Sequence, residues 1–143
     1  MEHYQKISLF LLRISSGWLF FYAGITKVVN PNWSASGYLG SAKTLPGLFS
    51  WFAQPQNIGW VNFVSQWGLT IVGAALVAGL LVRWASLGGV ALMILFYIPI
   101  LQFPVVGEHS YIVDEHIIYI FVFAVLALFN AGRYWGLDRM WGK

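Results

Sequence analysis

The chain of 143 residues contains no cysteine, and only 9% of its residues are charged. The absence of cysteine excludes disulfide bonds, thiolate metal sites and thiol redox chemistry. A soluble domain carries roughly 25% charged residues, whereas this chain is 59% hydrophobic and has a mean hydropathy of +0.69. The composition therefore predicts an integral membrane protein with a single domain over residues 1–143.

Several sequence motifs of common chemistries are also missing. The chain has no Gly-x-Ser-x-Gly nucleophile motif, no phosphate-binding loop, no His-Glu-x-x-His and no Glu-x-x-His pattern of helical di-iron bundles. We therefore expect neither nucleophilic catalysis nor a bound metal or haem. The net charge of +3 is small enough to reflect membrane topology, so a nucleic-acid partner is not expected either.

Long apolar segments dominate what is present. Each is about 20 residues long, which matches a hydrocarbon core of ~30 Å, and a lone segment in lipid satisfies its backbone groups only as a helix. The expected fold class is an all-α membrane protein, a four-transmembrane-helix bundle. The predicted helices cover residues 7–29, 60–82, 84–102 and 112–131.

Residues 30–59 form an unusually long connection between the first two predicted helices. Loops of this length are usually functional or disordered, and the aromatic content argues against disorder. Leu48, Phe49 and Phe52 lie at helical spacing between Pro46 and Pro55, which predicts a short interfacial or re-entrant helix. Whether this segment is a lid over a site or only a membrane-surface anchor stays open.

Basic residues are divided unequally between the two ends of the predicted bundle. With four spans, both chain termini and the Arg83 turn share one side, which holds five basic residues, and the other side holds Lys27 and Lys43. The positive-inside rule then predicts a protein of the cell (inner) membrane with both termini in the cytoplasm. No cleavable signal peptide is expected, because no small-residue cleavage site follows the first apolar run.

One stripe of the first helix combines both of its intramembrane charges with two glycines. Arg13, Gly17, Phe20, Gly24 and Lys27 follow each other at helical spacing, so this face is predicted to pack inward. For Arg13 three interpretations stay open. Its side chain could reach the cytoplasmic headgroups, tie the helix to the chain near Asn130 or Asp138, or contact a ligand.

Titratable residues collect before the fourth predicted helix. Glu108, His109, Asp114, Glu115 and His116 fall within nine positions, although the chain has only five acidic residues and three histidines. Part of this cluster fits a helix start, where carboxylates favour the positive end of the helix. Histidine titrates near neutrality, so a carboxylate–histidine–lysine group also suits proton exchange with a quinone oxygen.

The candidate site residues follow from this shared membrane level. The candidate catalytic residues are Lys27, Asp114, Glu115 and His116. The candidate ligand-binding residues are Arg13, Gln66, Tyr97, His109 and Tyr119.

Three stretches resemble the DoxX/DoxD family. The stretch RISSGWLFFYAGITKVVNP resembles the family's opening signature, here Arg13, Gly17, Ala23, Gly24, Lys27 and Pro31. VGAALVAGLLVR is similar to its glycine-bounded second helix, here Gly73, Gly79 and Arg83. NAGRYWGLD resembles its closing turn, here Gly132, Arg133, Leu137 and Asp138.

The resemblance implies a four-helix membrane protein associated with redox metabolism. Founding relatives are subunits of an archaeal thiosulfate:quinone oxidoreductase, and the wider clan resembles four-helix proteins that hold an apolar ligand beside acidic, histidine and aromatic residues. Many members carry an acid where this chain has Gln66 and Leu69. The implied cofactor is a quinone and the implied partners are membrane lipids and a second protein subunit. The alternative is a non-catalytic lipid-binding or assembly subunit, and whether the chain is an enzyme stays open.

Overall fold

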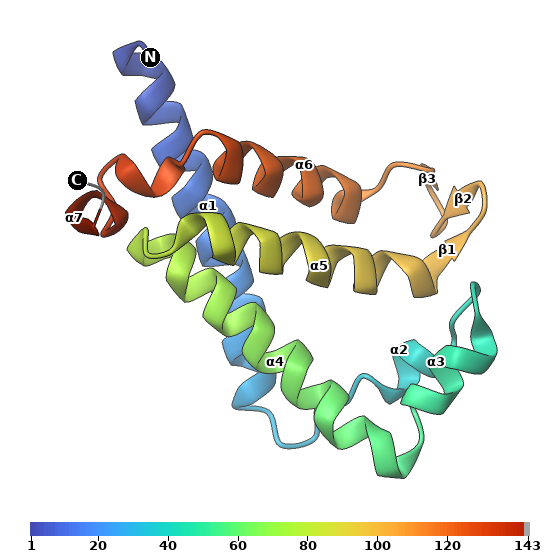
Figure 1. The fold of residues 1–143 in the computed structure, drawn as a ribbon. Coiled ribbons are helices and arrows are strands. Elements are labelled where there is room, and N and C mark those ends of the chain that lie inside the picture. The colour runs from blue at the N-terminus through green and yellow to red at the C-terminus, as the bar shows by residue number, and fades with distance from the viewer. Residues whose placement is uncertain (142–143) are drawn as a thin grey trace.

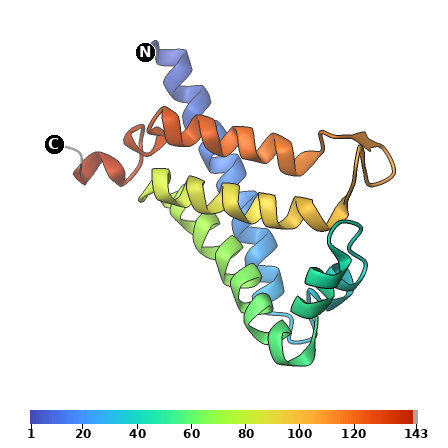
Figure 2. The same cartoon turned by 45° about the vertical axis from the view of Figure 1, so that its right-hand side comes forward.

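Four long helices form the body of this computed structural model, which describes residues 1–141 (Figure 1). They are α1 (His3–Val28), α4 (Pro55–Ala78), α5 (Val82–Ile100) and α6 (Glu115–Leu128). Helix α1 packs along α4, and α5 packs along α6. The two antiparallel pairs meet near the α4–α5 turn and diverge from there, as both views show (Figures 1 and 2). We call the end of the bundle at the α4–α5 turn the closed end, and the opposite end, where the pairs diverge, the open end.

Shorter elements complete the two ends. Two short helices, α2 (Ser36–Gly40) and α3 (Pro46–Phe52), lie between the diverging pairs at the open end (Figure 1). An antiparallel sheet in the order β1-β2-β3 connects α5 to α6, with strands Leu101–Gln102, Val105–Val106 and Ser110–Tyr111. The 3-10 helix η1 (Ala131–Arg133) and α7 (Asp138–Trp141) follow α6.

Three of the four expected spanning segments are long and apolar enough to cross a membrane. They are α1, α4 and α5, with 26, 24 and 19 residues. The fourth, expected over 112–131, is an apolar helix of only 14 residues. Tyr111 pairs with Val105 in the small sheet, and Asp114 caps the helix, so α6 begins later than its apolar run predicts. The prediction of a mostly helical membrane protein holds, and a fourth crossing is not shown.

Two other boundaries differ from the sequence expectation. Helix α4 begins at Pro55, five residues before its predicted start, since proline fits the first helical turn where no N–H donor is needed. The helix predicted between Pro46 and Pro55 is present as α3.

Glycines allow α1 and α4 to pack backbone to backbone. A Cβ atom on Gly73 would lie 2.1 Å from the amide nitrogen of Phe21, and one on Gly24 would lie 2.4 Å from that of Thr70. Arg13, Gly17, Phe20 and Gly24 are all buried in this interface, and Lys27 is half-buried. The inward-facing stripe predicted for the first helix is therefore confirmed, and close packing at small residues is the usual way in which helices associate in lipid.

Arg13 holds the closed end together. Its guanidinium is fully buried and donates to the carbonyls of Leu76 (2.7 Å) and Val77 (3.3 Å) near the end of α4. It also donates to the carbonyls of Tyr134 and Trp135, each at 3.3 Å. These carbonyls belong to a helix end and a turn, where backbone partners are scarce, and within residues 1–141 only that of Leu76 also accepts a backbone amide, from Gly79 at 3.1 Å. The side chain therefore does not reach the headgroups; it ties three parts of the chain together.

Asp138 is the acidic counterpart at the same end. Its carboxylate accepts hydrogen bonds from the amides of Leu81 (2.6 Å) and Val82 (2.9 Å) and so caps the start of α5. A Cβ atom on Gly132 would lie 2.1 Å from this carboxylate, so only glycine fits there. The closing motif from Gly132 to Asp138 is thus the cap of the α4–α5 hairpin.

The connection between α1 and α4, residues 29–54, is fastened to the end of α5. The Tyr38 hydroxyl donates to the carbonyl of Phe96, and the Thr44 hydroxyl donates to that of Leu101. The Lys43 amide donates to the carbonyl of Pro99 at 2.7 Å. A second small core beneath the connection contains Ala35, Leu39 and Phe49. The connection therefore covers the open end as an ordered structure.

Candidate ligand-binding site

A cavity of about 570 Å³ lies between the diverging helix pairs, beneath the connection. This volume falls within the ~300–1,000 Å³ of typical small-molecule sites. Helices α1, α4, α5 and α6 all contribute walls, and most of the lining is aliphatic or aromatic. The apolar residues include Leu19, Phe20, Trp33, Leu69, Met93, Phe96 and Ile100.

A smaller set of polar side chains completes the lining. They come from α1, the connection, α4 and α6, and they are Lys27, Ser34, Tyr38, Ser65, Glu115, His116 and Tyr119. A few polar groups in an apolar cavity give a ligand its orientation. The cavity thus suits an apolar molecule that carries a small number of hydrogen-bonding atoms.

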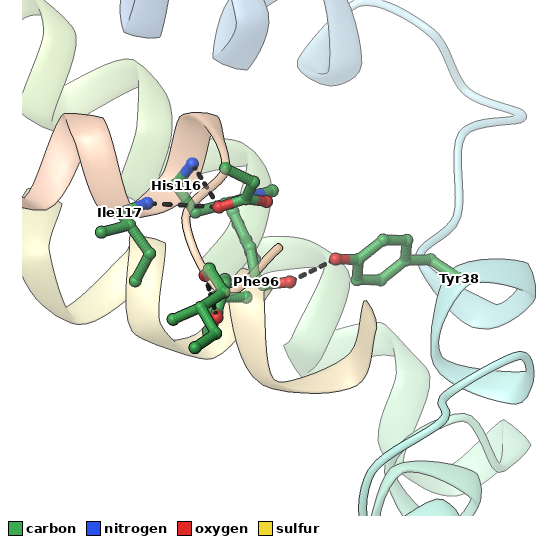
Figure 3. A network of polar contacts seen from close by, with 7 residues as sticks. Tyr38, Phe96, His116 and Ile117 are labelled. Atoms are coloured by element: carbon green, nitrogen blue, oxygen red, sulfur yellow. Dashed lines mark hydrogen bonds and ion pairs between the residues drawn. The ribbon is translucent and has the colours of Figure 1, made fainter. Parts of the chain in front are cut away.

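His116 forms a close pair with Asp114 at the start of α6. One carboxylate oxygen of Asp114 accepts from the amides of His116 (3.0 Å) and Ile117 (3.3 Å), which caps the helix. The other lies 2.7 Å from His116 Nδ1. Figure 3 shows these contacts at the first turn of α6. A carboxylate at Nδ1 favours a proton there, which leaves Nε2 as the nitrogen available to a ligand.

Lys27 is present on the cavity wall without its expected carboxylate partner. Its Nζ donates to the carbonyl of Ala23 at 2.8 Å and lies 5.6 Å from the centre of the Trp33 ring. Within residues 1–141, no carboxylate oxygen lies within 4 Å of this nitrogen. The ammonium is instead held by a backbone carbonyl of its own helix and by an aromatic face, and it shares the cavity wall with Glu115 and His116 without a direct ion pair in this part of the chain.

Tyr38 stands on the connection and reaches the opposite helix pair. Figure 3 shows it extending from α2 towards Phe96 on α5. Burial, with smaller contributions from the charges of Asp114 and Glu115, raises the pKa of Tyr38 to about 12. Its hydroxyl therefore keeps its proton at physiological pH and acts as a hydrogen-bond donor.

Two of the candidates, Tyr97 on α5 and Gln66 on α4, are not part of the cavity lining. The Tyr97 hydroxyl donates to the carbonyl of Ile112, and its ring centre is 6.4 Å from that of His116. The Gln66 amide donates to the carbonyl of Lys27 at 3.2 Å. Neither residue lines the cavity, so each supports a lining residue.

Two further candidates lie apart from the cavity. The His109 side chain is 93% exposed on the turn between β2 and β3, with Nε2 3.9 Å from Glu108. Arg13 lies at the closed end with its contacts on main-chain carbonyls. Within residues 1–141, no group of three or more acidic or histidine side chains is placed to hold a metal ion.

Several lining residues were missed by the sequence reading. On α4 the stripe Ser65, Leu69, Val72 and Leu76 is buried, whereas the neighbouring Gln66 is half-buried. The helical spacing of this stripe could have identified Ser65. Trp33 and Tyr38 carry no comparable signal, because their positions depend on how the connection folds back over α5.

These observations define a helical membrane protein with a mostly apolar cavity at one end of its bundle. A family model described as DoxX matches residues 8–100, which is more than half of the chain, so the protein belongs to the DoxX family. No curated protein and no solved structure matches the chain.

Proposed function

We propose that this protein is a membrane subunit of redox metabolism that holds a quinone, or a similar apolar carbonyl compound, and exchanges protons with it. The observation that carries the proposal is the Asp114–His116 pair on the wall of an otherwise apolar cavity of about 570 Å³. An imidazole that is half-buried and fixed on the wall of an apolar cavity suits proton exchange with a quinone oxygen.

The polar lining residues have separate roles in this proposal. Reduction of a quinone takes two electrons and two protons, and a second protein subunit supplies the electrons. His116 Nε2 exchanges protons with one ligand oxygen, while Asp114 fixes the orientation of the ring through Nδ1. Lys27 and Tyr119 approach from α1 and α6 and donate hydrogen bonds to a ligand oxygen. Glu115, which is exposed and lines the same cavity, passes protons to and from water.

The proposed location is the cytoplasmic membrane, with both termini in the cytoplasm and the open end on the outer side. The Met1 and Phe10 side chains lie beside Tyr134 and Trp135, so both terminal regions share the closed end. Because the chain has no cysteine, a single cysteine at Ser41 should react with an impermeant maleimide in intact cells, and one at Glu2 should not. The reverse labelling would place the cavity on the inner side.

The test of the function is to identify what the purified protein carries. Organic extraction and mass spectrometry should find a quinone at about one molecule per chain in the parent protein, and much less in His116→Leu. His109→Leu is the matched control, because this histidine is exposed and does not line the cavity. Stoichiometric phospholipid without quinone, unaffected by His116→Leu, would favour the lipid-binding or assembly subunit instead.

A further inference from the structure

A second pocket of about 110 Å³ lies next to the cavity, between α4 and α5. We call it the side pocket. Its lining is almost entirely apolar and includes Leu39, Phe49, Phe52, Val61 and Leu92. It is too small for a whole ligand. Apolar pockets of about this size stay free of water and accept small apolar groups.

The cavity and the side pocket share part of their walls. Ala35, Tyr38, Ser65 and Phe96 line both, so only these residues separate the two spaces. The hydrogen bond from Tyr38 to the Phe96 carbonyl crosses this shared wall (Figure 3). An occupant of the cavity that extends beyond it towards α4 and α5 meets the side pocket next.

Polarity is distributed unequally between the two spaces. Lys27, Glu115 and His116 line the cavity and are absent from the side pocket. The side pocket is also lined by Trp60, Val64 and Leu95, which are exposed on the outer surface of α4 and α5. Both helices are long and apolar enough to cross a membrane, so we expect this surface to face hydrocarbon and the side pocket to open towards lipid.

We propose that the ligand is a chain-bearing amphiphile. Its polar head lies in the cavity against His116, and its hydrocarbon chain passes the shared wall at Tyr38 and Phe96 and leaves through the side pocket between α4 and α5. This inference rests on the proposed function and adds to it, because it states that the ligand carries a chain and where the chain leaves the bundle. The segregation of charge and the shared wall carry the argument.

The test compares two probes with the same head on the purified protein in detergent. The probes are 2,3-dimethoxy-5-methyl-1,4-benzoquinone and its 6-decyl derivative, and binding is measured by quenching of tryptophan fluorescence with correction for partition into micelles. Val64→Phe narrows the side pocket without adding a tryptophan. Ile71→Phe is the matched control, two turns further along the same exposed face of α4 and in neither space.

The parent protein and Ile71→Phe should bind the decyl probe at least about tenfold more tightly than the chainless probe, which equals the burial of roughly two methylene groups. Val64→Phe should lose this advantage and keep its affinity for the chainless probe. Equal affinities of the parent for both probes, or an equal loss of both in Val64→Phe, would overturn the chain exit and leave the proposed function standing. If the parent binds neither probe, the proposed function fails and the chain exit fails with it.

Discussion

Charged side chains serve different purposes at the closed and open ends of the bundle. At the closed end, Arg13 and Asp138 have main-chain partners at 2.6–3.3 Å, and the backbone at Gly79 and Gly132 packs closely against them. At the open end, Lys27 and Glu115 line a cavity of about 570 Å³, and neither forms an ion pair within residues 1–141. The charged side chains at the two ends therefore differ in burial and in how much of their hydrogen-bonding capacity main-chain groups already use.

The difference separates residues that hold the fold from residues that are available to a ligand. Both terminal nitrogens of the Arg13 guanidinium donate to backbone carbonyls, and its Nε is enclosed in the packed interior, so the side chain has little capacity left for another partner. A charge on a cavity wall can change partners when a ligand enters. Membrane helices often carry their functional residues as buried charges, but here the most deeply buried charge, Arg13, is the structural one.

Removing Arg13 should have the largest effect on stability. In Arg13→Leu the carbonyls of Val77 and Tyr134 lose their donor, and unsatisfied buried groups should lower the free energy of unfolding by roughly 2–4 kcal/mol. The melting temperature, followed by circular dichroism in detergent, measures this loss of stability. Arg83→Leu removes the same charge at an exposed position and should change the melting temperature little. A melting temperature of Arg13→Leu equal to that of the parent would erase the distinction between the ends.

A methyl group between α1 and α4 should have the next largest effect. Gly73→Ala places Cβ 2.1 Å from the Phe21 amide nitrogen, so the helices must separate, at a cost of roughly 1–3 kcal/mol. Gly59→Ala is the control on the same helix, because its Cβ meets nothing within 4 Å. The control should be neutral or slightly more stable. Thermal unfolding of both variants checks this, and equal losses would show that the packing is not the cause.

Removing the Tyr38 hydroxyl should destabilise the protein less. Tyr38→Phe loses the hydrogen bond to the Phe96 carbonyl, worth about 1 kcal/mol. The pKa of Tyr38 is raised to about 12 in the folded protein, against ~10 in an unfolded chain. The unfolded side chain therefore ionises first, and the contribution of Tyr38 is full below pH ~10 and is lost as the pH rises towards 12. The melting temperature should fall more steeply between pH ~10 and ~12 for the parent than for Tyr38→Phe. An equal pH dependence of the two melting temperatures would contradict the assignment.

Replacing Lys27 should have the smallest effect on folding. Lys27→Met keeps the unbranched apolar stem and loses a hydrogen bond within its own helix and a contact with Trp33, so stability should change by no more than about 0.5–1 kcal/mol. Quinone retention should fall, because a donor on the cavity wall is gone. A large loss of stability would mean that Lys27 belongs with Arg13 as a structural charge.

Apolar runs and helical spacing predicted much of the fold. The inward face of α1 followed from the spacing of Arg13, Gly17, Phe20 and Gly24, and α3 followed from Leu48, Phe49 and Phe52. The short α6 could not be predicted in this way. Tyr111 forms a strand pair directly before the predicted segment, and Asp114 caps the helix, so α6 begins only at Glu115. Hydropathy alone does not distinguish these uses from a longer helix.

The candidate site was predicted in part. Lys27, Glu115, His116 and Tyr119 line one cavity, and Asp114 contacts His116 directly. The sequence could not reveal that Lys27 lacks a carboxylate partner, nor that Tyr38 reaches α5, because both side chains donate to backbone carbonyls, Lys27 within its own helix and Tyr38 across to α5. Every residue type supplies the same carbonyl, so such partners leave no trace in the sequence.

The contacts of Arg13 also imply an order of events during synthesis. Its partners on α4 are 63 and 64 positions away, but its partners at Tyr134 and Trp135 are 121 and 122 positions away. The ribosome must therefore reach Trp135 before this side chain has all of these hydrogen bonds. The pair α1–α4 can assemble while α6 is still being made. The carbonyls of Tyr134 and Trp135 then complete the hydrogen bonds of the Arg13 guanidinium.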